Sequence, residues 1–318
     1  MKKTILIFAL LLCLTTGAWA TTPVKQWGQL KVVGTQLCDQ NNNPVTLRGI
    51  SLGWHNIWPR FYNKQCVNWL ISDWHATVIR AAMGVKIDDN YLENPSFALQ
   101  CIEPVVEQCI KKGVYVIIDW HAHDTYQKEA VEFFGRMAKK YGKHPNVIYE
   151  IFNEPVDQSW AELKAYATAC INEIRKYDPD NIILVGCPHW DQDIHLCAQD
   201  PLKGYANIMY TVHFYAATHK QWLRDRAQEA IKQGIPVFLS ECGASEADGN
   251  GKLDSQEWNA WIDWAEQNKV SWVNWSLSDK DETCSMLLPR ASAKGKWADD
   301  VLKPTGKLAK KTLLKYNK

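Results

Sequence analysis

Short apolar runs rich in β-branched residues alternate with longer amphipathic stretches along most of this chain. The short runs predict strands buried on both faces, and they are residues 45–51, 77–83, 114–121, 146–154, 181–186, 207–215, 236–242 and 271–278. The longer stretches have helical periodicity, clearest at residues 97–113, 131–142, 161–178, 219–234 and 255–269. Several of them end in Gly or Asn after a basic residue, as helix C-termini do.

This alternation predicts the fold class. Eight strand–helix units in a chain of 318 residues predict an α/β protein with a (β/α)8 TIM barrel. A doubly wound open sheet is the alternative, but no glycine fingerprint follows the first strand. Before that strand, residues 30–49 predict a β-hairpin around an Asn-rich turn that Pro44 closes. We expect residues 21–318 to form a single catalytic barrel with no appended binding module.

The first twenty residues have the pattern of a secretory signal peptide. Lys2 and Lys3 precede an apolar run over residues 5–14, and a small-residue A-x-A site ends at Ala20. The apolar run is too short to cross about 30 Å of hydrocarbon. We therefore expect cleavage near Ala20, export to the extracellular space, and no membrane association afterwards.

Nine of the ten cysteines remain after that cleavage, so they cannot all pair within one chain. Cys101 and Cys109 lie eight positions apart in one predicted helix, roughly 12 Å, which is too far for a disulfide. Cys66 in the preceding helix is one candidate partner, and Cys187 and Cys197 bracket a loop that could close locally. The cysteine spacing is not that of a zinc site, and we expect neither metal nor cofactor.

Charge and aromatic content limit the partners. The chain has 36 basic and 35 acidic residues, which argues against nucleic acid or an anionic membrane surface. Its sixteen tryptophans suit either a surface that stacks on carbohydrate or a Trp-rich core, and the sequence leaves both open.

Active sites of such barrels lie at the C-terminal ends of the strands. The polar and aromatic residues at those ends are Trp54, His55, Arg80, His121, Asn153, Glu154, His213, Tyr215, Glu241 and Trp275. Glu154 and Glu241, across the barrel from each other, fit glycoside hydrolysis, which needs one carboxylic acid and a second carboxylate. A separation of about 5 to 5.5 Å gives retention of configuration, and about 6.5 to 9.5 Å gives inversion. A plain salt bridge with Arg80 is the structural alternative.

The chain resembles glycoside hydrolase family 5, and most of all its secreted endo-β-1,4-glucanases. The resemblance rests on six stretches in the family's order, IRAAMGV, VIIDWHAHD, VIYEIFNEP, VHFYAATHK, FLSECG and VNWSLSDKDE. It implies a retaining mechanism with Glu154 as acid/base and Glu241 as nucleophile. Asn153 would bind the sugar 2-hydroxyl, while Arg80 and Tyr215 would orient Glu241.

The same resemblance implies further sugar contacts. His121 and His213 would line the central subsite, and Trp275 would stack on the sugar ring there. More distant sugars would meet Lys280, Glu282, Trp54, His55 and Trp58. The implied partner is a β-glucan polysaccharide bound by a monomer. A β-mannanase or xyloglucan hydrolase on the same frame is the rival activity, and a silent sugar-binding protein would have lost a carboxylate.

Three further features receive structural interpretations. Glu150 would lie roughly 13 Å below the mouth, and we expect it to pair with Arg48 on the first strand. Residues 247–254 suggest a calcium loop, but Lys252 and Leu253 break the pattern, so we expect a turn. The glycosylation sequon at Asn274 lies on the eighth strand facing the site, where we expect no modification.

Overall fold

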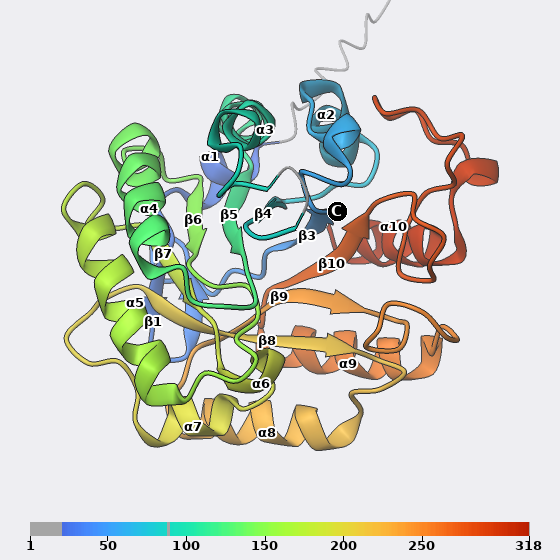
Figure 1. The fold of residues 1–318 in the computed structure, drawn as a ribbon. Helices are drawn as coiled ribbons and strands as arrows, with labels where there is room; N and C mark the ends of the chain where they lie inside the picture. Colours follow the sequence, from blue (N-terminus) through green and yellow to red (C-terminus); the bar gives the residue numbers. More distant parts are fainter. Residues whose placement is uncertain (1–20, 88–89, 318) are drawn as a thin grey trace, which may run out of the picture.

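The computed structural model describes residues 21–87 and 90–317, so the expected signal peptide lies outside the described residues. In this part of the chain, parallel strands close into a barrel in the order β10-β3-β4-β5-β6-β7-β8-β9, as predicted (Figure 1). The strands are β3 (Arg48–Leu52), β4 (Val78–Gly84), β5 (Tyr115–His121), β6 (Val147–Glu150), β7 (Ile182–Val185), β8 (Ile208–Tyr215), β9 (Val237–Gly243) and β10 (Trp272–Leu277).

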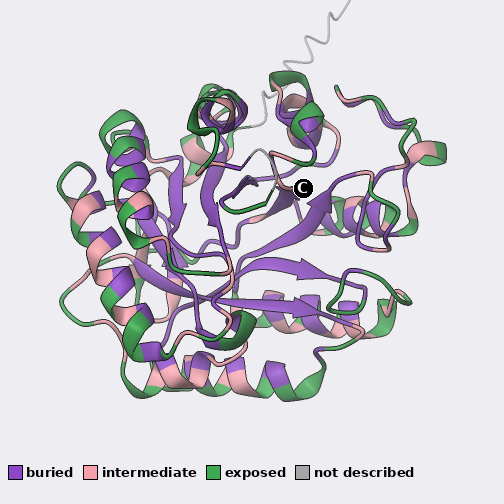
Figure 2. Cartoon of the chain, viewed as in Figure 1, coloured by how far each residue is buried: buried purple, intermediate pink, exposed green. Residues whose placement is uncertain are grey.

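Helices surround the barrel (Figure 1). The longer ones are α2 (Lys64–Ser72), α3 (Pro95–Lys112), α4 (Gln127–Tyr141), α5 (Trp160–Arg175), α8 (Gln221–Lys232), α9 (Ser255–Asn268) and α10 (Pro304–Tyr316). The short ones are α1 (Pro23–Trp27), α6 (Pro188–Asp191), α7 (Ile194–Gln199), η1 (Pro59–Phe61) and η2 (Asp299–Val301). The five helical stretches predicted from periodicity correspond to α3, α4, α5, α8 and α9. Their outer faces are exposed while the strands are buried, as Figure 2 shows.

The N-terminal region contains the expected Asn-rich turn and, before it, a second turn that the sequence analysis did not predict. Strands β1 (Lys31–Val33) and β2 (Gln36–Cys38) pair around Gly34, whose φ of +60° suits glycine in a tight turn. The Asn-rich segment then turns the chain back, so that Pro44 forms an antiparallel bridge with Cys38 and the Val45 N–H donates to the Leu37 carbonyl at 2.8 Å. There Asp39 Oδ1 accepts from the backbone N–H groups of Asn41 and Asn43, both at 2.8 Å. These side-chain bonds stabilise the turn that Pro44 closes, as the sequence predicted.

The barrel interior has an apolar floor and a polar layer above it. The inward side chains of the floor form one buried cluster, which comprises Leu47, Val78, Tyr115, Ile117, Ile148, Ile182, Leu184, Met209, Phe238 and Val273. Leu30, Leu37 and Val45 from the hairpin region join this cluster and close the bottom of the barrel. Further along β5 and β8 the same strand faces carry Asp119, His121, Thr211 and His213. Alternation along each strand therefore places the polar side chains at the mouth.

Most tryptophans serve the core between the barrel and its helices. Five of them are among the largest fully buried side chains, namely Trp74, Trp120, Trp258, Trp261 and Trp272. Trp261 stacks on Phe214 with ring centroids 4.1 Å apart, and thereby fixes α9 on β8. The sequence did not decide whether the tryptophans form a core or a sugar-binding surface. In the described residues most of them pack in the core, and a minority lie at the mouth.

All nine cysteines of the described residues are buried and unbridged. The Sγ atoms of Cys187 and Cys197 lie 3.2 Å apart without a disulfide bond. That these two cysteines pair on oxidation stays a prediction. Among residues 21–87 and 90–317, no helix combines the length and apolarity that a membrane crossing needs.

Candidate active site

Arg80 is the centre of the polar layer and is fully buried on β4. It donates to Glu150 from Nε at 2.6 Å, to Glu241 from Nη1 at 2.8 Å and to Asn153 Oδ1 from Nη2 at 2.6 Å. Its Nη2 also lies 3.0 Å from Asp119. Burial opposes the charge, but the three carboxylates outweigh burial and hold the pKa of Arg80 well above its ordinary value. Arg80 is therefore a permanent cation that organises the mouth.

The Arg80–Glu150 pair corrects the expected partner of Glu150. Because Leu47 points into the floor, Arg48 faces the helices instead, and its Nε donates to Glu266 on α9 at 2.6 Å. Glu150 is fully buried, as expected, but its pairing with Arg48 is wrong, and its depth of roughly 13 Å below the mouth stays a prediction.

Both carboxylate oxygens of Glu241, on β9, are engaged. Oε2 accepts from Arg80, and Oε1 accepts from the Tyr215 hydroxyl at 2.6 Å. Burial, together with the charge of Glu241, raises the pKa of Tyr215 well above its ordinary value, so the phenol keeps its proton. The Tyr215 backbone N–H donates to His219 Nδ1 at 2.9 Å. These contacts fix the orientation of the Glu241 carboxylate.

Glu154 follows β6 and is less buried than Glu241, with 14% of its side chain exposed. Its Oε1 lies 2.8 Å from His213 Nδ1, and its Oε2 lies 3.6 Å from His123 Nε2. Burial would raise the pKa of Glu154, but the hydrogen bond and charge of His213 outweigh burial and lower it. The pKa of Glu154 therefore depends on its contact with His213.

The two predicted catalytic carboxylates lie close together. One oxygen of Glu154, one of Glu241 and a ring nitrogen of His213 all lie within 4.8 Å of one another. This spacing matches a retaining pair at about 5 to 5.5 Å and falls short of the 6.5 to 9.5 Å that inversion requires. A site without metal or cofactor stays a prediction.

His121 is buried against Asp119, with Nδ1 2.7 Å from Oδ2. Burial, and then the charge of Arg80, lower the pKa of His121 to about 3, so the imidazole is neutral and Nδ1 donates to Asp119. Trp275 stacks on the His121 ring with centroids 5.1 Å apart, and Trp54 meets it edge-on at 4.5 Å. The histidine therefore supports an aromatic wall.

That wall is an apolar patch of Trp54, Ala82, Tyr215, Trp275 and Cys284. Indole faces of this kind can stack on the apolar face of a sugar while nearby polar groups bind its hydroxyls. Trp54 and Trp275 both belong to this patch, and their contacts with sugar stay a prediction.

Two cavities lie near Glu154 at the mouth. One of about 170 Å³ is lined by Trp54, His121 and His123, among others. The other, of about 490 Å³, is lined by Glu154, His213, Tyr215, Trp190 and further residues. The smaller cavity reaches Glu154 through His123, whose Nε2 lies 3.6 Å from Glu154 Oε2.

Trp190 is a candidate that the sequence reasoning missed. Its side chain is 40% exposed at the larger cavity, on a turn with left-handed backbone at His189, Trp190 and Asp191. The strand-end rule, applied to the fifth strand, would have pointed to it. Asp119 and His123 were also missed, although Asp119 shares the inward face of the third strand with His121 and His123 follows that strand by two residues.

Two predicted site residues are buried in the packing behind the mouth rather than exposed at it. His55 is fully buried, and its Nδ1 accepts from the Gly84 backbone N–H at 3.0 Å. Trp58 is also buried and packs over Gly53, where an added Cβ would meet its ring at 2.6 Å. Packing after β3 therefore takes both away from the positions that the sequence suggested.

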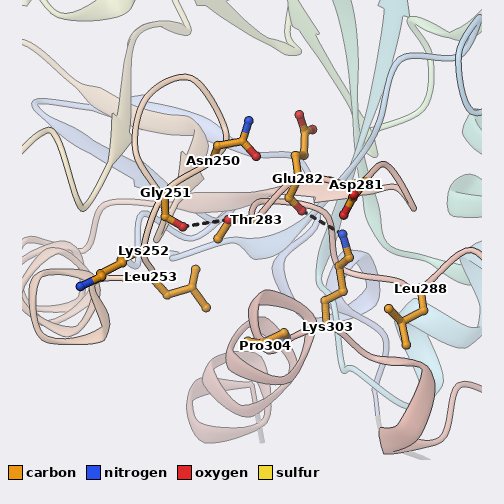
Figure 3. Close-up of a pocket in the computed structure, with 10 residues that line it drawn as sticks. All are labelled: Asn250, Gly251, Lys252, Leu253, Asp281, Glu282, Thr283, Leu288, Lys303 and Pro304. Atoms are coloured by element: carbon orange, nitrogen blue, oxygen red, sulfur yellow. Dashed lines mark hydrogen bonds between the residues drawn. The ribbon is translucent and has the colours of Figure 1, made fainter.

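Lys280 and Glu282 lie in the loop after β10 and pair with each other at 2.5 Å, Nζ to Oε2. Figure 3 shows Glu282 beside a cavity of about 710 Å³, where its backbone oxygen accepts from Lys303 Nζ at 3.0 Å. None of the predicted catalytic residues lines this cavity, which includes Asn250 and Leu253. The chemistry therefore assigns the site to the cavities beside Glu154.

Asn153 has a free donor for a ligand. Its Oδ1 accepts from Arg80, while its Nδ2 is buried without a hydrogen-bond partner among the described residues. Such an orphan group is costly unless something fills the site. This fits the predicted contact to a sugar hydroxyl.

The two remaining motifs lie as expected. Asn274 is buried on β10. Residues 247–254 contain a turn in which Gly249 N–H donates to the Glu246 carbonyl at 3.0 Å, with Gly249 and Gly251 at φ of +87° and +71°.

Comparison with known sequences gives one family. Residues 38–281 match the model for cellulase, glycosyl hydrolase family 5. An endoglucanase of Clostridium saccharobutylicum is 43% identical over 293 residues, which are 90% of this chain and 65% of that protein. Endoglucanase Z of Dickeya dadantii is 41% identical over 88% of this chain and 65% of its own length. This chain thus spans just under two thirds of the length of these curated relatives.

Solved structures of other proteins superpose closely on this chain. A structure from Cytophaga hutchinsonii superposes with a TM-score of 0.91 at 45% identity, covering 93% of this chain and 97% of the other. The endoglucanase catalytic domain of Thermobifida fusca has a TM-score of 0.87 at 33% identity, covering 92% and 99%. A variant of that domain has been solved in complex with cellotetraose, with the same TM-score.

Proposed function

Because the chain belongs to the cellulase family, glycosyl hydrolase family 5, we propose that it is an endo-acting glycoside hydrolase. It cleaves internal β-1,4-glucosidic bonds of cellulose or a related β-glucan and retains the anomeric configuration. The proximity of Glu154 and Glu241, with atoms within 4.8 Å, carries the mechanism. Relatives named endoglucanase, and a related domain that binds cellotetraose, support the substrate class.

In the first step Glu241 attacks the anomeric carbon while Glu154 protonates the departing glycosidic oxygen. Arg80 and Tyr215 hold the two Glu241 oxygens, so the nucleophile is oriented before the sugar arrives. The product is a covalent glycosyl-enzyme and a shortened chain with a free hydroxyl.

In the second step Glu154, now a carboxylate, takes a proton from water as that water attacks the anomeric carbon. The bond to Glu241 breaks and both carboxyl groups return to their starting states. Two inversions at one carbon give net retention. Trp54, Trp275 and Trp190 supply ring faces for the sugars, and Asn153 supplies a donor for a hydroxyl.

The mechanism is tested with Glu241→Ala. Hydrolysis of a natural β-glucan should be abolished, and added azide should restore turnover of an activated β-glycoside as a glycosyl azide of inverted configuration. Failure of azide rescue in folded protein, or inverted products from the wild type, would defeat the covalent scheme.

The substrate is tested by reducing-end release from carboxymethylcellulose, mannan and xyloglucan. We expect carboxymethylcellulose to be cleaved internally, with a rapid fall in viscosity. Activity on mannan alone would replace the glucanase by a mannanase on the same frame, and xyloglucan alone would favour the other rival.

We also propose that the protein is exported and acts as a monomer outside the cell. The basic, apolar and A-x-A segments of residues 1–20 support export. The mass of the protein in culture fluid should show a mature chain that begins near Thr21, and light scattering should give one chain's mass. An uncleaved intracellular protein or a stable dimer would contradict these expectations.

A further inference from the structure

Asp191 is a buried acid to which the two-carboxylate mechanism gives no task. It lies in α6, after β7, with no exposed surface, and its backbone is left-handed with φ of +59°. Its Oδ1 accepts from the Cys187 backbone N–H at 2.5 Å, and its Oδ2 accepts from the Thr211 hydroxyl at 2.7 Å. These contacts fix the carboxyl group rigidly inside the polar layer.

The same Oδ2 lies behind the histidine that contacts Glu154. His213 Nε2 is 3.2 Å from Asp191 Oδ2 and 2.9 Å from Ser240 Oγ, while Nδ1 is 2.8 Å from Glu154 Oε1. Asp191, His213 and Glu154 therefore form a continuous row of contacts from the buried interior to the mouth. An acid behind an imidazole fixes the tautomer and stabilises the charged ring.

The charges around His213 favour its protonated form. The titratable groups that face it from the surrounding elements are Asp119 on β5, Glu150 and Glu154 on and after β6, Asp191 on α6, His219 after β8, and Glu241 on β9. Burial lowers the pKa of His213, but Asp191 and the glutamates outweigh burial and raise it well above its ordinary value. Burial raises the pKa of Asp191, while the charge of His213 and the hydrogen bond from Thr211 oppose that rise, so the charged form of Asp191 depends on its contact with His213.

We propose that Asp191 is a positioning residue that acts through His213 and sets how tightly the Glu154–His213 pair holds its proton. The inference rests on the proposed function. In the free enzyme the pair shares one proton, on either Glu154 or His213, and Glu154 gives it to the departing glycosidic oxygen when it acts as acid. The negative charge of Asp191 holds that proton in the pair at higher pH, and so extends the pH range in which the acid is loaded.

The test is Asp191→Asn, which keeps the shape and the acceptor for Cys187 but removes the charge. The basic limb of kcat/KM against pH should move to lower pH by about one unit. The acidic limb should stay in place.

Asp178 provides a matched control. It is a fully buried aspartate before β7 that accepts from the Asn181 backbone N–H at 3.0 Å and from Tyr149 OH at 2.7 Å, away from the mouth. Asp178→Asn should lose stability and leave both limbs of the profile unmoved. An equal shift in both variants, or none in folded Asp191→Asn, would overturn the proposal.

A second measurement needs no Asp191 variant. Nitrogen-15 NMR of His213 in the wild type, assigned with His213→Gln, should show both ring nitrogens protonated at pH 6 to 7. A neutral ring at that pH would also overturn the proposal. Absence of hydrolysis in the wild type would instead defeat the proposed function, so the two failures are distinguishable.

Discussion

At the scale of single residues, the hydroxyl of Tyr215 is the most direct test of how Glu241 is held. Tyr215→Phe removes one donor to a carboxylate and leaves the ring in the aromatic patch. A hydrogen bond to a charged group contributes about 1.5–3 kcal/mol, so kcat/KM should fall about 10- to 100-fold. Steady-state kinetics on a soluble β-glucan would measure this loss.

The control is Tyr149→Phe, which removes the buried hydroxyl bond to Asp178 on the outer side of β6. It should cost stability without lowering kcat/KM. Equal losses of activity in both variants would show that Tyr215 acts only through packing.

The ionisation of buried Glu150 should make the free energy of unfolding depend on pH. Burial would raise the pKa of Glu150, but the charge of Arg80 and the bonds from His213 and Arg80 lower it to about 2 from an ordinary 4.5. Because the folded pKa is depressed, the stabilisation is complete above pH 4.5 and is lost as the pH falls towards 2. Glu150→Gln should therefore cost about 3–5 kcal/mol at pH 7, and less at pH 3.

Urea unfolding of the wild type and the variant at both pH values measures this difference. Glu266→Gln is the matched control, since Glu266 pairs with Arg48 with 15% of each side chain exposed. Its cost should be smaller because water and salt screen that pair. A cost for Glu150→Gln that stays constant from pH 7 to pH 3 would contradict the assigned ionisation.

The residues at strand ends could be predicted because a barrel strand has only two faces. Arg80, His121, His213 and Glu241 follow from alternation once the strands are found. The partner of Glu150 could not be predicted, because strand alternation fixes a face and not which of several cations reaches across the barrel.

At the scale of elements, the hairpin β1–β2 serves as the floor of the barrel. Leu37 is buried in the floor cluster, so Leu37→Ala leaves a cavity and should cost about 2–5 kcal/mol. Val33 on the same hairpin is 44% exposed, and Val33→Ala should change stability by less than about 0.5 kcal/mol. Thermal or urea unfolding would compare them.

Neither hairpin variant should change kcat/KM in folded protein, because the floor lies beneath the polar layer. A loss of kcat/KM in Leu37→Ala at a temperature where it stays folded would show that the floor also supports the catalytic carboxylates.

The strands and long helices could be predicted from periodicity, whereas the segment between β7 and β8 could not. It has three consecutive left-handed residues, His189, Trp190 and Asp191, and bulky side chains rarely adopt this conformation. No propensity signals such a turn. The buried bonds of Asp191 stabilise it, and these become visible only when β7, β8 and the turn are assembled.

At the scale of the whole molecule, the fold isolates charge from solvent. Five carboxylates, Asp119, Glu150, Glu154, Asp191 and Glu241, share the polar layer with the cations Arg80 and His213. Such a layer is tolerated because the closed barrel holds each group against a partner. The chemistry therefore depends on short-range contacts rather than on the field of the protein surface.

The charge on the protein surface should have little effect on how fast substrate is captured. The chain has a net charge of +1, and the proposed β-glucan is uncharged, so long-range attraction cannot contribute much to encounter. Raising the NaCl concentration shortens the Debye length from about 30 Å at 0.01 M to about 3 Å at 1 M, yet kcat/KM on a neutral soluble β-glucan should change less than about two-fold. The anionic carboxymethylcellulose serves as the contrast, because salt alters that polymer itself. A steep fall of kcat/KM with salt on the neutral glucan would mean that exposed charges such as Lys280 contribute most of the binding energy, in place of the tryptophan faces and the buried Arg80 layer.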